Sequence, residues 1–201
     1  MPLPHQQETA IGYDLPAEDA LDELLKTRRV LFLADEASES HKTNEPDAEA
    51  QLVADLLRRI YRFTKGSFDP AKTVGVIVPY RRQIALIRQA ISRLSSITSP
   101  LSEITIDTVE RFQGSQRDVI IYALGVSHRY QLDFLTATTF TDANGTAIDR
   151  KLNVALTRAR KQMIIVGQPD ILNHVPLFRQ LISDYAMPFS AKKFARIAEK
   201  T

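Results

Sequence analysis

The chain has no cysteine, which excludes disulfide bonds and metal sites built from thiolates. It has no apolar run close to the roughly 20 residues that a membrane-spanning helix requires, and no signal-peptide pattern at its N-terminus. It also has little net charge, because 26 basic residues stand against 24 acidic ones. A nucleic-acid partner would therefore have to be argued from local clusters of charge. We expect a cytoplasmic protein with no membrane partner.

Several nucleotide and metal motifs are missing as well. No Gly-Lys-Ser or Gly-Lys-Thr occurs, so the chain has no phosphate loop of its own. No Gly-x-Gly-x-x-Gly follows any apolar run, which argues against a Rossmann-type small-molecule enzyme. The histidines are scattered without metal-ligand spacing, and we expect no metal ligands among the residues of this chain: His5, His41, His128 and His174.

Short apolar runs alternate with stretches whose apolar residues recur at helical spacing. The predicted strands are 30–34, 74–78, 104–106, 119–123 and 163–167, and the main predicted helices are 47–61, 81–94 and 176–185. Strands that are apolar throughout predict an α/β domain with a mainly parallel sheet and helices on both faces. Ligands of such sheets usually bind outside the carboxyl ends of the strands, so the loops after Val78, Ile106 and Ala123 are the first candidates.

The ends of the chain differ in pattern from its centre. We expect residues 1–28 to form a tail or linker with a short helix, residues 29–187 to form the domain, and residues 188–201 to form a basic tail. Within the domain, Asn144-Gly145 is a tight-turn signal that predicts a small hairpin.

Three segments concentrate polar and basic side chains. The first, 78–83, places Arg81 and Arg82 at a predicted helix start, where free N–H groups already favour anions. The second, 106–118, contains Thr108 and Gln113, which can bond phosphate and sugar, and Gly114, which allows close approach of a ligand. Each segment can also be a turn or connection with solvated side chains.

The third segment, 150–160, has three basic side chains among apolar residues at helical spacing. We expect its helix to project Arg158 and Arg160 from one end, with the strand 163–167 directly behind. Guanidinium groups held in this way are suited to bidentate contacts with phosphate oxygens. The alternative is a solvated basic face on an amphipathic helix.

In this order, the three segments resemble motifs IV, V and VI of superfamily 1 helicases. The closest resemblance is to the 1B branch, which includes the nonsense-mediated-decay helicase and the nuclease-helicase that trims Okazaki flaps. Its signatures are T-P-Y-R-x-Q, D-T-V-D-x-F-Q-G-x-E-x-D and R-R-L-N-V-A-L-T-R-A-R. Here they read V-P-Y-R-R-Q at 78–83, D-T-V-E-R-F-Q-G-S-Q-R-D at 107–118 and R-K-L-N-V-A-L-T-R-A-R at 150–160.

The resemblance covers about residues 74–167 and implies the second, C-terminal RecA-like domain of a helicase, a three-layer fold of the P-loop NTPase type. It implies ATP and Mg²⁺ as cofactors, bound mainly by an N-terminal RecA-like domain of the same protein that this chain does not contain. It also implies single-stranded DNA or RNA as a partner. We expect the chain to be inactive as an ATPase by itself.

By the same resemblance, Arg158 is similar to the catalytic arginine that reaches the γ-phosphate. The positions that would line the nucleotide cleft are Arg81, Gly114, Gln116 and Arg160. Those that would bind nucleic acid are Pro79, Tyr80, Thr108, Arg111 and Gln113. Those with a structural role in motif VI are Arg150, Asn153 and Thr157.

The chain departs from the family at four points. It lacks the arginine that often precedes the Glu-Ala pair found here at Glu49-Ala50, a second phosphate contact. Val78 stands where threonine is usual, Gln116 stands where glutamate is usual, and the stretch 128–149 is longer than its counterpart. Loss of the glutamate charge weakens the expectation of a contact with the nucleotide ribose at Gln116. These departures leave a second interpretation open, a non-catalytic nucleic-acid-binding or regulatory module with a helicase-like fold.

Overall fold

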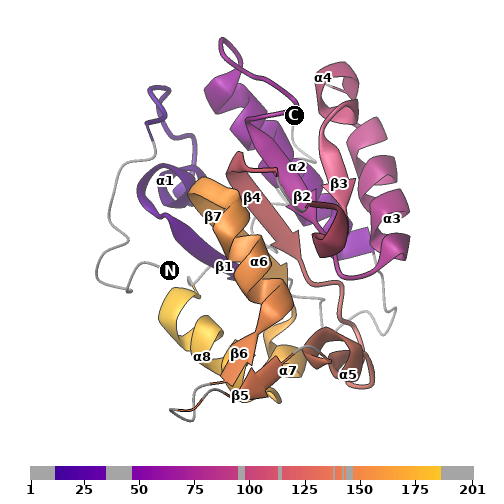
Figure 1. Ribbon diagram of the computed structural model, residues 1–201. Coiled ribbons are helices and arrows are strands. Elements are labelled where there is room, and N and C mark those ends of the chain that lie inside the picture. The colour runs from indigo at the N-terminus through magenta and orange to yellow at the C-terminus, as the bar shows by residue number, and fades with distance from the viewer. Residues whose placement is uncertain are drawn as a thin grey trace, which may run out of the picture.

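A single parallel sheet runs through the computed structural model, which describes residues 12–34, 47–94, 98–112, 115–137, 139–141, 143 and 147–186 (Figure 1). Its five strands are in the order β1-β7-β4-β2-β3. They are β1 (Val30–Ala34), β2 (Val74–Ile77), β3 (Thr105–Asp107), β4 (Arg117–Ala123) and β7 (Ala159–Gly167). Every neighbouring pair is parallel.

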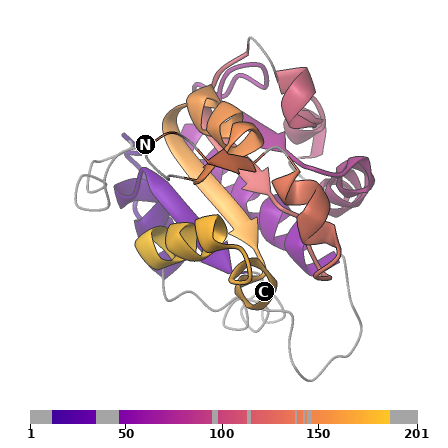
Figure 2. The same ribbon diagram turned by 60° about the horizontal axis from the view of Figure 1, so that its bottom comes forward.

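Helices cover both faces of this sheet (Figures 1 and 2). One face carries α1 (Ala20–Thr27), α2 (Asp47–Thr64), α3 (Arg81–Ser92) and α4 (Thr98–Ser102). The other carries the 3₁₀ helix η2 (Val109–Phe112), α5 (Gln131–Thr136), α6 (Arg150–Arg158), α7 (Pro169–Leu172) and α8 (Pro176–Tyr185). The three-layer α/β architecture predicted from the sequence is thereby confirmed.

Alternation along the strands builds the two cores. In β4, Val119 and Ile121 pack toward α2 and α3, whereas Ile120 and Tyr122 pack toward α6 and α8. Because successive side chains of a strand point to opposite faces, a strand that is apolar throughout has to be covered on both sides.

Parallel pairing gives the sheet two distinct edges. We call the edge where the strands begin the amino edge; there Arg117 of β4 lies beside Ala159 of β7. We call the edge where they end the carboxyl edge; there Ile77 of β2 lies beside Asp107 of β3. Both edges carry residues of the helicase-like motifs.

The N-terminal segment packs into the domain. Residues 1–28 were expected to be a tail or linker with a short helix. The helix is α1, and its Leu21 and Leu25 are fully buried in the core. The ring of Tyr13 stacks on that of Phe63 in α2, with centroids 4.7 Å apart. This packing places residues 12–28 against the same core as the strands.

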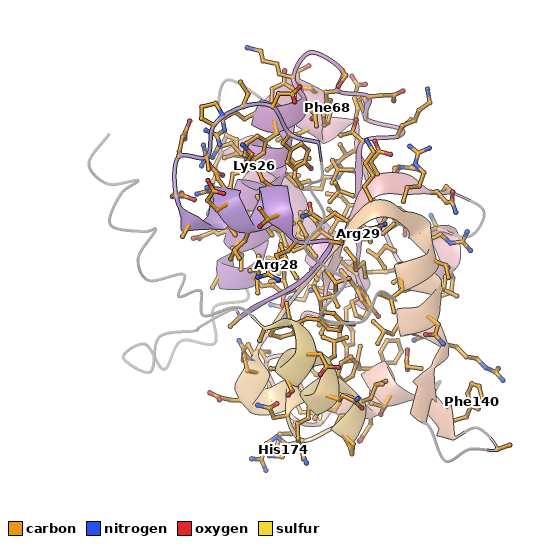
Figure 3. All side chains as sticks on the ribbon, turned by 90° about the vertical axis from the view of Figure 1, so that its left-hand side faces the viewer. Lys26, Arg28, Arg29, Phe68, Phe140 and His174 are labelled. Carbon is orange, nitrogen blue, oxygen red and sulfur yellow. The ribbon has the colours of Figure 1, made fainter. Side chains whose placement is uncertain are left out.

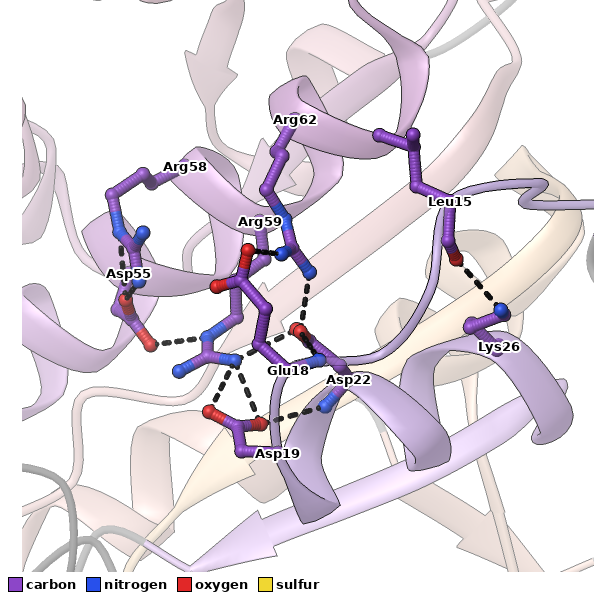
Figure 4. Close-up of polar contacts among 9 residues, drawn as sticks. All are labelled: Leu15, Glu18, Asp19, Asp22, Lys26, Asp55, Arg58, Arg59 and Arg62. Atoms are coloured by element: carbon purple, nitrogen blue, oxygen red, sulfur yellow. Dashed lines mark hydrogen bonds and ion pairs between the residues drawn. The ribbon is translucent and has the colours of Figure 1, made fainter.

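A buried ionic network fixes α1 against α2 (Figure 4). Asp22 is fully buried and forms ion pairs with Arg59, at 2.7 Å, and with Arg62. Arg59 also bonds Asp19 and Asp55. Desolvation would raise the pKa of Asp22, but the hydrogen bond from the Glu18 N–H and the two arginines outweigh it and hold the pKa below its usual value.

The stretch 128–149 contains a helix that was not predicted. After α5, strands β5 (Thr139–Thr141) and β6 (Ala147–Asp149) pair antiparallel, so the stretch contains the predicted hairpin. Leu132 and Leu135 anchor α5 in the core. Asp149 then caps α6, because its side chain accepts a hydrogen bond from the Leu152 N–H.

The junction of α6 and β7 corrects a prediction. The helix ends at Arg158 and β7 begins at Ala159, so Arg160 lies on a strand and does not project from the helix. The apolar run that predicted a strand from Met163 is only its buried part, whereas Arg160 and Lys161 are exposed. Pairing with Arg117 extends the strand to Ala159.

A small buried polar cluster joins α2, α3 and the end of β4. The Glu49 carboxylate accepts hydrogen bonds from the Gly125 N–H at 3.0 Å and from the Gln83 amide at 2.7 Å. Gly125 has φ of +61°, and a Cβ at this position would lie 2.0 Å from the Gln83 side chain. Only glycine combines this conformation with this contact.

Replacement of Gly125 by alanine should therefore destabilise the domain. A left-handed φ costs an alanine about 1–2 kcal/mol, and displacing Gln83 would add about 1 kcal/mol for its lost hydrogen bond. We expect a loss of about 2–3 kcal/mol in urea unfolding. Gly66→Ala is the matched control, because a Cβ there meets nothing within 4 Å. Equal effects of the two substitutions would contradict this account.

In the described part of the chain, no helix is long and apolar enough to span a bilayer.

Candidate nucleotide and nucleic-acid interface

Helix α6 connects the two groups of candidate residues. It lies across the sheet from the β5–β6 hairpin to the start of β7 (Figure 1), so its first residues are near the carboxyl edge and Arg158 is at the amino edge. The loops after Val78 and Ile106, which the sequence singled out, place motif IV and the start of motif V at the carboxyl edge. The ends of motifs V and VI meet instead at the amino edge.

Arg158 at the amino edge has neither an ion pair with a described residue nor a hydrogen-bond partner for its Nε, which is buried. A buried donor that lacks a partner costs about 1–3 kcal/mol. An anion bound at this edge would remove that cost.

Gln116 lies beside Arg158 and ties motif V to motif VI. Its Nε2 donates to the backbone oxygen of Thr157 at 3.4 Å. An ionised glutamate has no donor and could not make this bond. The glutamine that departs from the family pattern thus has a contact that the usual residue lacks.

Arg160 differs from Arg158 because its charge is compensated. Its Nη2 is 2.8 Å from Asp118, which also pairs with Lys161 at 3.2 Å. Neighbouring Arg117 is buried, and its guanidinium donates to the Thr105 hydroxyl at 3.0 Å. Burial lowers the pKa of Arg117, and the charge of Arg160 adds to the effect. Arg158 alone among these residues keeps a cation without a protein partner in the described structure.

Motif IV stands at the carboxyl edge, so the length of the strands separates it from Arg158 at the amino edge. Pro79 is buried and Arg81, which begins α3, is exposed. Arg81 is therefore not assembled with Gln116, Arg158 and Arg160, although the sequence grouped all four in one nucleotide cleft. The separation follows from the topology, because Arg81 comes after a strand whereas the others come just before or at the start of one.

Tyr80 is already engaged within the protein. Its hydroxyl donates to the Gln131 backbone oxygen at 2.8 Å, and its ring lies 5.1 Å from that of Phe134. Burial raises the pKa of Tyr80 to about 12, and nearby Tyr130 contributes. The side chain expected to touch nucleic acid thus supports α5.

Motif V begins at the same edge with Thr108, Glu110 and Arg111. The Thr108 N–H donates to Asp107 at 2.8 Å, and Arg111 lies 3.7 Å from the same carboxylate. The pKa of Glu110 is lowered by a hydrogen bond from its own N–H, by the Thr108 hydroxyl and by the charge of Lys151. Gln113 and Gly114, also predicted site residues, lie outside the described residues.

The remaining motif VI residues have local contacts. The guanidinium of Arg150 lies 5.1 Å from the ring centroid of Phe140, and the Thr157 hydroxyl donates to the Val154 oxygen at 2.8 Å. Asn153 is exposed, and the helix start is capped by Asp149. Asp149 was not among the predicted residues, although an aspartate three residues before an apolar helical position is a sequence signal for a cap.

Two further residues were missed. Asp118, the last residue of the motif V match, was given no role because its partners Arg160 and Lys161 are about forty positions away and meet it only through pairing of β4 with β7. Lys151, whose ammonium lies 4.2 Å from the ring centroid of Phe134, depends in the same way on the unpredicted helix α5. Within the described ranges, no group of three or more acidic or histidine side chains could hold a metal ion.

Comparison with known proteins agrees with this arrangement. A family profile described as an AAA domain matches residues 15–170. The chain is 34% identical over 135 residues, 66% of its length, to a regulator of nonsense transcripts 1 homolog of Arabidopsis thaliana. It is 30% identical over 163 residues, 78% of its length, to the DNA replication ATP-dependent helicase/nuclease JHS1 of the same plant. To helicase sen1 of Schizosaccharomyces pombe it is 35% identical over 112 residues, 55% of its length.

The chain spans only 10%, 11% and 6% of the length of these three relatives. The matched region nevertheless includes all three motifs, the five-stranded parallel sheet and the edge that holds Arg158. The chain therefore belongs to the superfamily 1 helicases, as a RecA-like domain with motifs IV, V and VI in the branch of the nonsense-mediated-decay and nuclease-helicase proteins.

Proposed function

We propose that this chain is the C-terminal motor domain of an ATP-dependent DNA or RNA helicase and that Arg158 is its arginine finger. The observation that carries the proposal is the buried, unpartnered Nε of Arg158 beside two cations that Asp118 compensates. Phosphoryl transfer places charge on the oxygens of the transferred group, and a positioned guanidinium stabilises that charge.

The residues present fit one half of an ATP site. Arg158 has the free donor that a phosphate requires, and Gln116 holds the neighbouring backbone through its hydrogen bond to the Thr157 oxygen. ATP with Mg²⁺ would supply the phosphoryl group and its metal-bound oxygens, held mainly by an N-terminal RecA-like domain. The chain's own contribution is to hold Arg158 rigidly at the end of α6, where Asp149 caps one end of the helix and β7 continues from the other.

The carboxyl edge is the proposed track for a single strand of DNA or RNA. Thr108 and Arg111 stand there after the end of β3, and exposed Arg81 is added to them from the nucleotide-cleft group. Pro79, which the sequence also assigned to nucleic-acid binding, is buried at the end of β2. Contacts to phosphate and sugar from such residues bind without reading sequence. Thr108 and Arg111 now contact Glu110 and Asp107, so a bound backbone would replace these local partners.

A second candidate is a nucleic-acid-binding or regulatory module without catalysis. The Gln116 contact favours it, because an amide committed to the Thr157 oxygen is not free for a nucleotide ribose. The two candidates differ in whether the intact protein hydrolyses ATP when single strands are added.

The proposal predicts that the purified 201-residue chain does not turn over ATP, with or without Mg²⁺ and single strands. A lone cation can stabilise transferred charge but cannot bind and orient the nucleotide, for which these folds use a phosphate loop. The measurement is phosphate release at micromolar protein. The Arg158→Ala chain is the control, since contaminating activity would be equal in both. Turnover that this substitution removes would contradict the prediction.

A further inference from the structure

Exposed aromatic rings gather in the stretch that distinguishes this chain from its family. Among the described residues, the exposed large apolar side chains are Leu15, Tyr130, Phe134 and Phe140. Tyr130 is 72% exposed, Phe134 49% and Phe140 42%. Tyr130 and Phe134 are one helical turn apart at α5, and the adjacent residues Lys151 and Arg150 lie over Phe134 and Phe140. We call these three rings the patch, since grouped exposed apolar side chains mark interaction sites.

Cations lie over two of these rings. The Lys151 ammonium is 4.2 Å from the centroid of Phe134, and the Arg150 guanidinium is 5.1 Å from that of Phe140. At an exposed site such a contact contributes only about 0.5–1 kcal/mol, so either cation can move to a phosphate at little cost. Phe134 and Phe140 therefore each have a cation close enough to bind the phosphate of a nucleotide whose base stacks on the ring.

The patch is continuous with motifs IV and V. Tyr80 of motif IV contacts α5 through its hydroxyl and its ring. The charge of Lys151 lowers the pKa of Glu110 in motif V. A single strand of nucleic acid bound along Thr108 and Arg111 would therefore contact these rings as it continues across the surface.

Two of the rings, Tyr130 and Phe134, stand on the buried helix α5. Leu132 and Leu135 are buried on the opposite side of α5. The Gln131 side chain accepts hydrogen bonds from the N–H groups of Ser127 and His128, each at 2.8 Å, which fixes the loop before the helix. Rings that are already ordered lose little entropy when they bind.

We propose that Tyr130, Phe134 and Phe140 form a base-stacking platform for single-stranded nucleic acid, with Arg150 and Lys151 binding the adjoining phosphates. The inference rests on the proposed function and adds to it contacts with bases, whereas the motif residues contact the backbone. Within residues 128–151 the bases Arg129, Arg150 and Lys151 equal the acids Asp133, Asp142 and Asp149 in number, but Asp149 is buried as the cap of α6. Stacking is independent of sequence, because every base has a π-face.

The absence of tryptophan gives a direct test. In the 201-residue chain, Tyr130→Trp introduces a single tryptophan, whose fluorescence should be quenched by a single-stranded oligothymidylate. An abasic oligonucleotide of equal length should quench it little. Phe68→Trp is the control reporter, since Phe68 and Phe140 lie at opposite ends of the molecule (Figure 3), and it should respond to neither.

Affinity separates this inference from the proposed function. The double variant Tyr130→Ala/Phe140→Ala should lose about 5- to 100-fold in affinity for oligothymidylate, the equivalent of stacking one base, and little for the abasic strand. Thr108→Ala should weaken both equally. If wild type binds both strands equally and the double variant is unchanged, the platform is refuted while the track stands, and the patch would fit a protein partner. If neither oligonucleotide binds, both proposals fail.

Discussion

In the intact helicase, Arg158→Ala should lower the rate of ATP hydrolysis by about 10³- to 10⁵-fold. The reason is that Arg158 has a buried Nε without a partner and no ion pair with a described residue. Arg117 also has an unpartnered Nε, but its guanidinium bonds Gln116 and Thr105, and Asp118 compensates Arg160 and Lys161. Nucleotide affinity should change only a few-fold, because the other domain is expected to hold most of the nucleotide. The measurement is steady-state turnover at saturating single strands, together with titration of a fluorescent nucleotide.

Two matched variants make this result specific. Arg160→Ala removes a cation that Asp118 already compensates, and we expect a much smaller loss of turnover. Arg158→Lys keeps the charge but loses the planar fork, so its rate should lie between those of wild type and alanine. Equal losses for Arg158→Ala and Arg160→Ala would refute the assignment of Arg158 as the arginine finger.

Asp22→Asn should destabilise the domain by about 3 kcal/mol. Removing one partner from a buried ionic network leaves the remaining charges without compensation, which costs roughly 3–5 kcal/mol. The lower end applies because Arg59 keeps Asp19 and Asp55, and Arg62 keeps Glu18. The measurement is the free energy of unfolding in urea at pH 7. Glu23→Gln on the same helix is the control; Glu23 is exposed, and we expect a loss below about 1 kcal/mol.

The same residue gives the pH dependence a definite sign. The pKa of Asp22 is lower in the folded protein than in an unfolded chain, where it is about 3.9. Its stabilising contribution is therefore complete above that value and is lost as the pH falls through the folded pKa. The difference in stability between wild type and Asp22→Asn should shrink below about pH 4. A difference that stays constant down to pH 2 would contradict the ionic origin of the effect.

The sheet could be predicted from the sequence because its strands are apolar on both faces. The runs beginning at Val30 and Val74 need no tertiary information, and helix α8 has the predicted bounds. Helix α5 was not predicted because it has only six residues. Its position depends on hydrogen bonds from Tyr80 and Ser127 to Gln131, which form only in the folded protein.

Motifs could single out the candidate residues of the site, but not which of them lie together. Arg81, Gln116 and Arg158 belong to three separate segments of the sequence. Their order along the chain does not say at which edge of the sheet each segment lies. That depends on whether a loop follows a strand or precedes one, and on the pairing of Arg117 with Ala159. Compensation of Arg160 by Asp118 depends on the same pairing.

Helix α6 fixes where changes of chain length can be tolerated. One residue added between Lys151 and Arg158 would rotate the arginine by about 100° around the helix axis, and no side-chain change could restore its direction. A residue added between β5 and β6 has no such effect, because Asp149, the N-cap, still fixes the first residue of α6. The hairpin that carries Phe140, one ring of the proposed platform, can therefore change in length while Arg158 keeps its place.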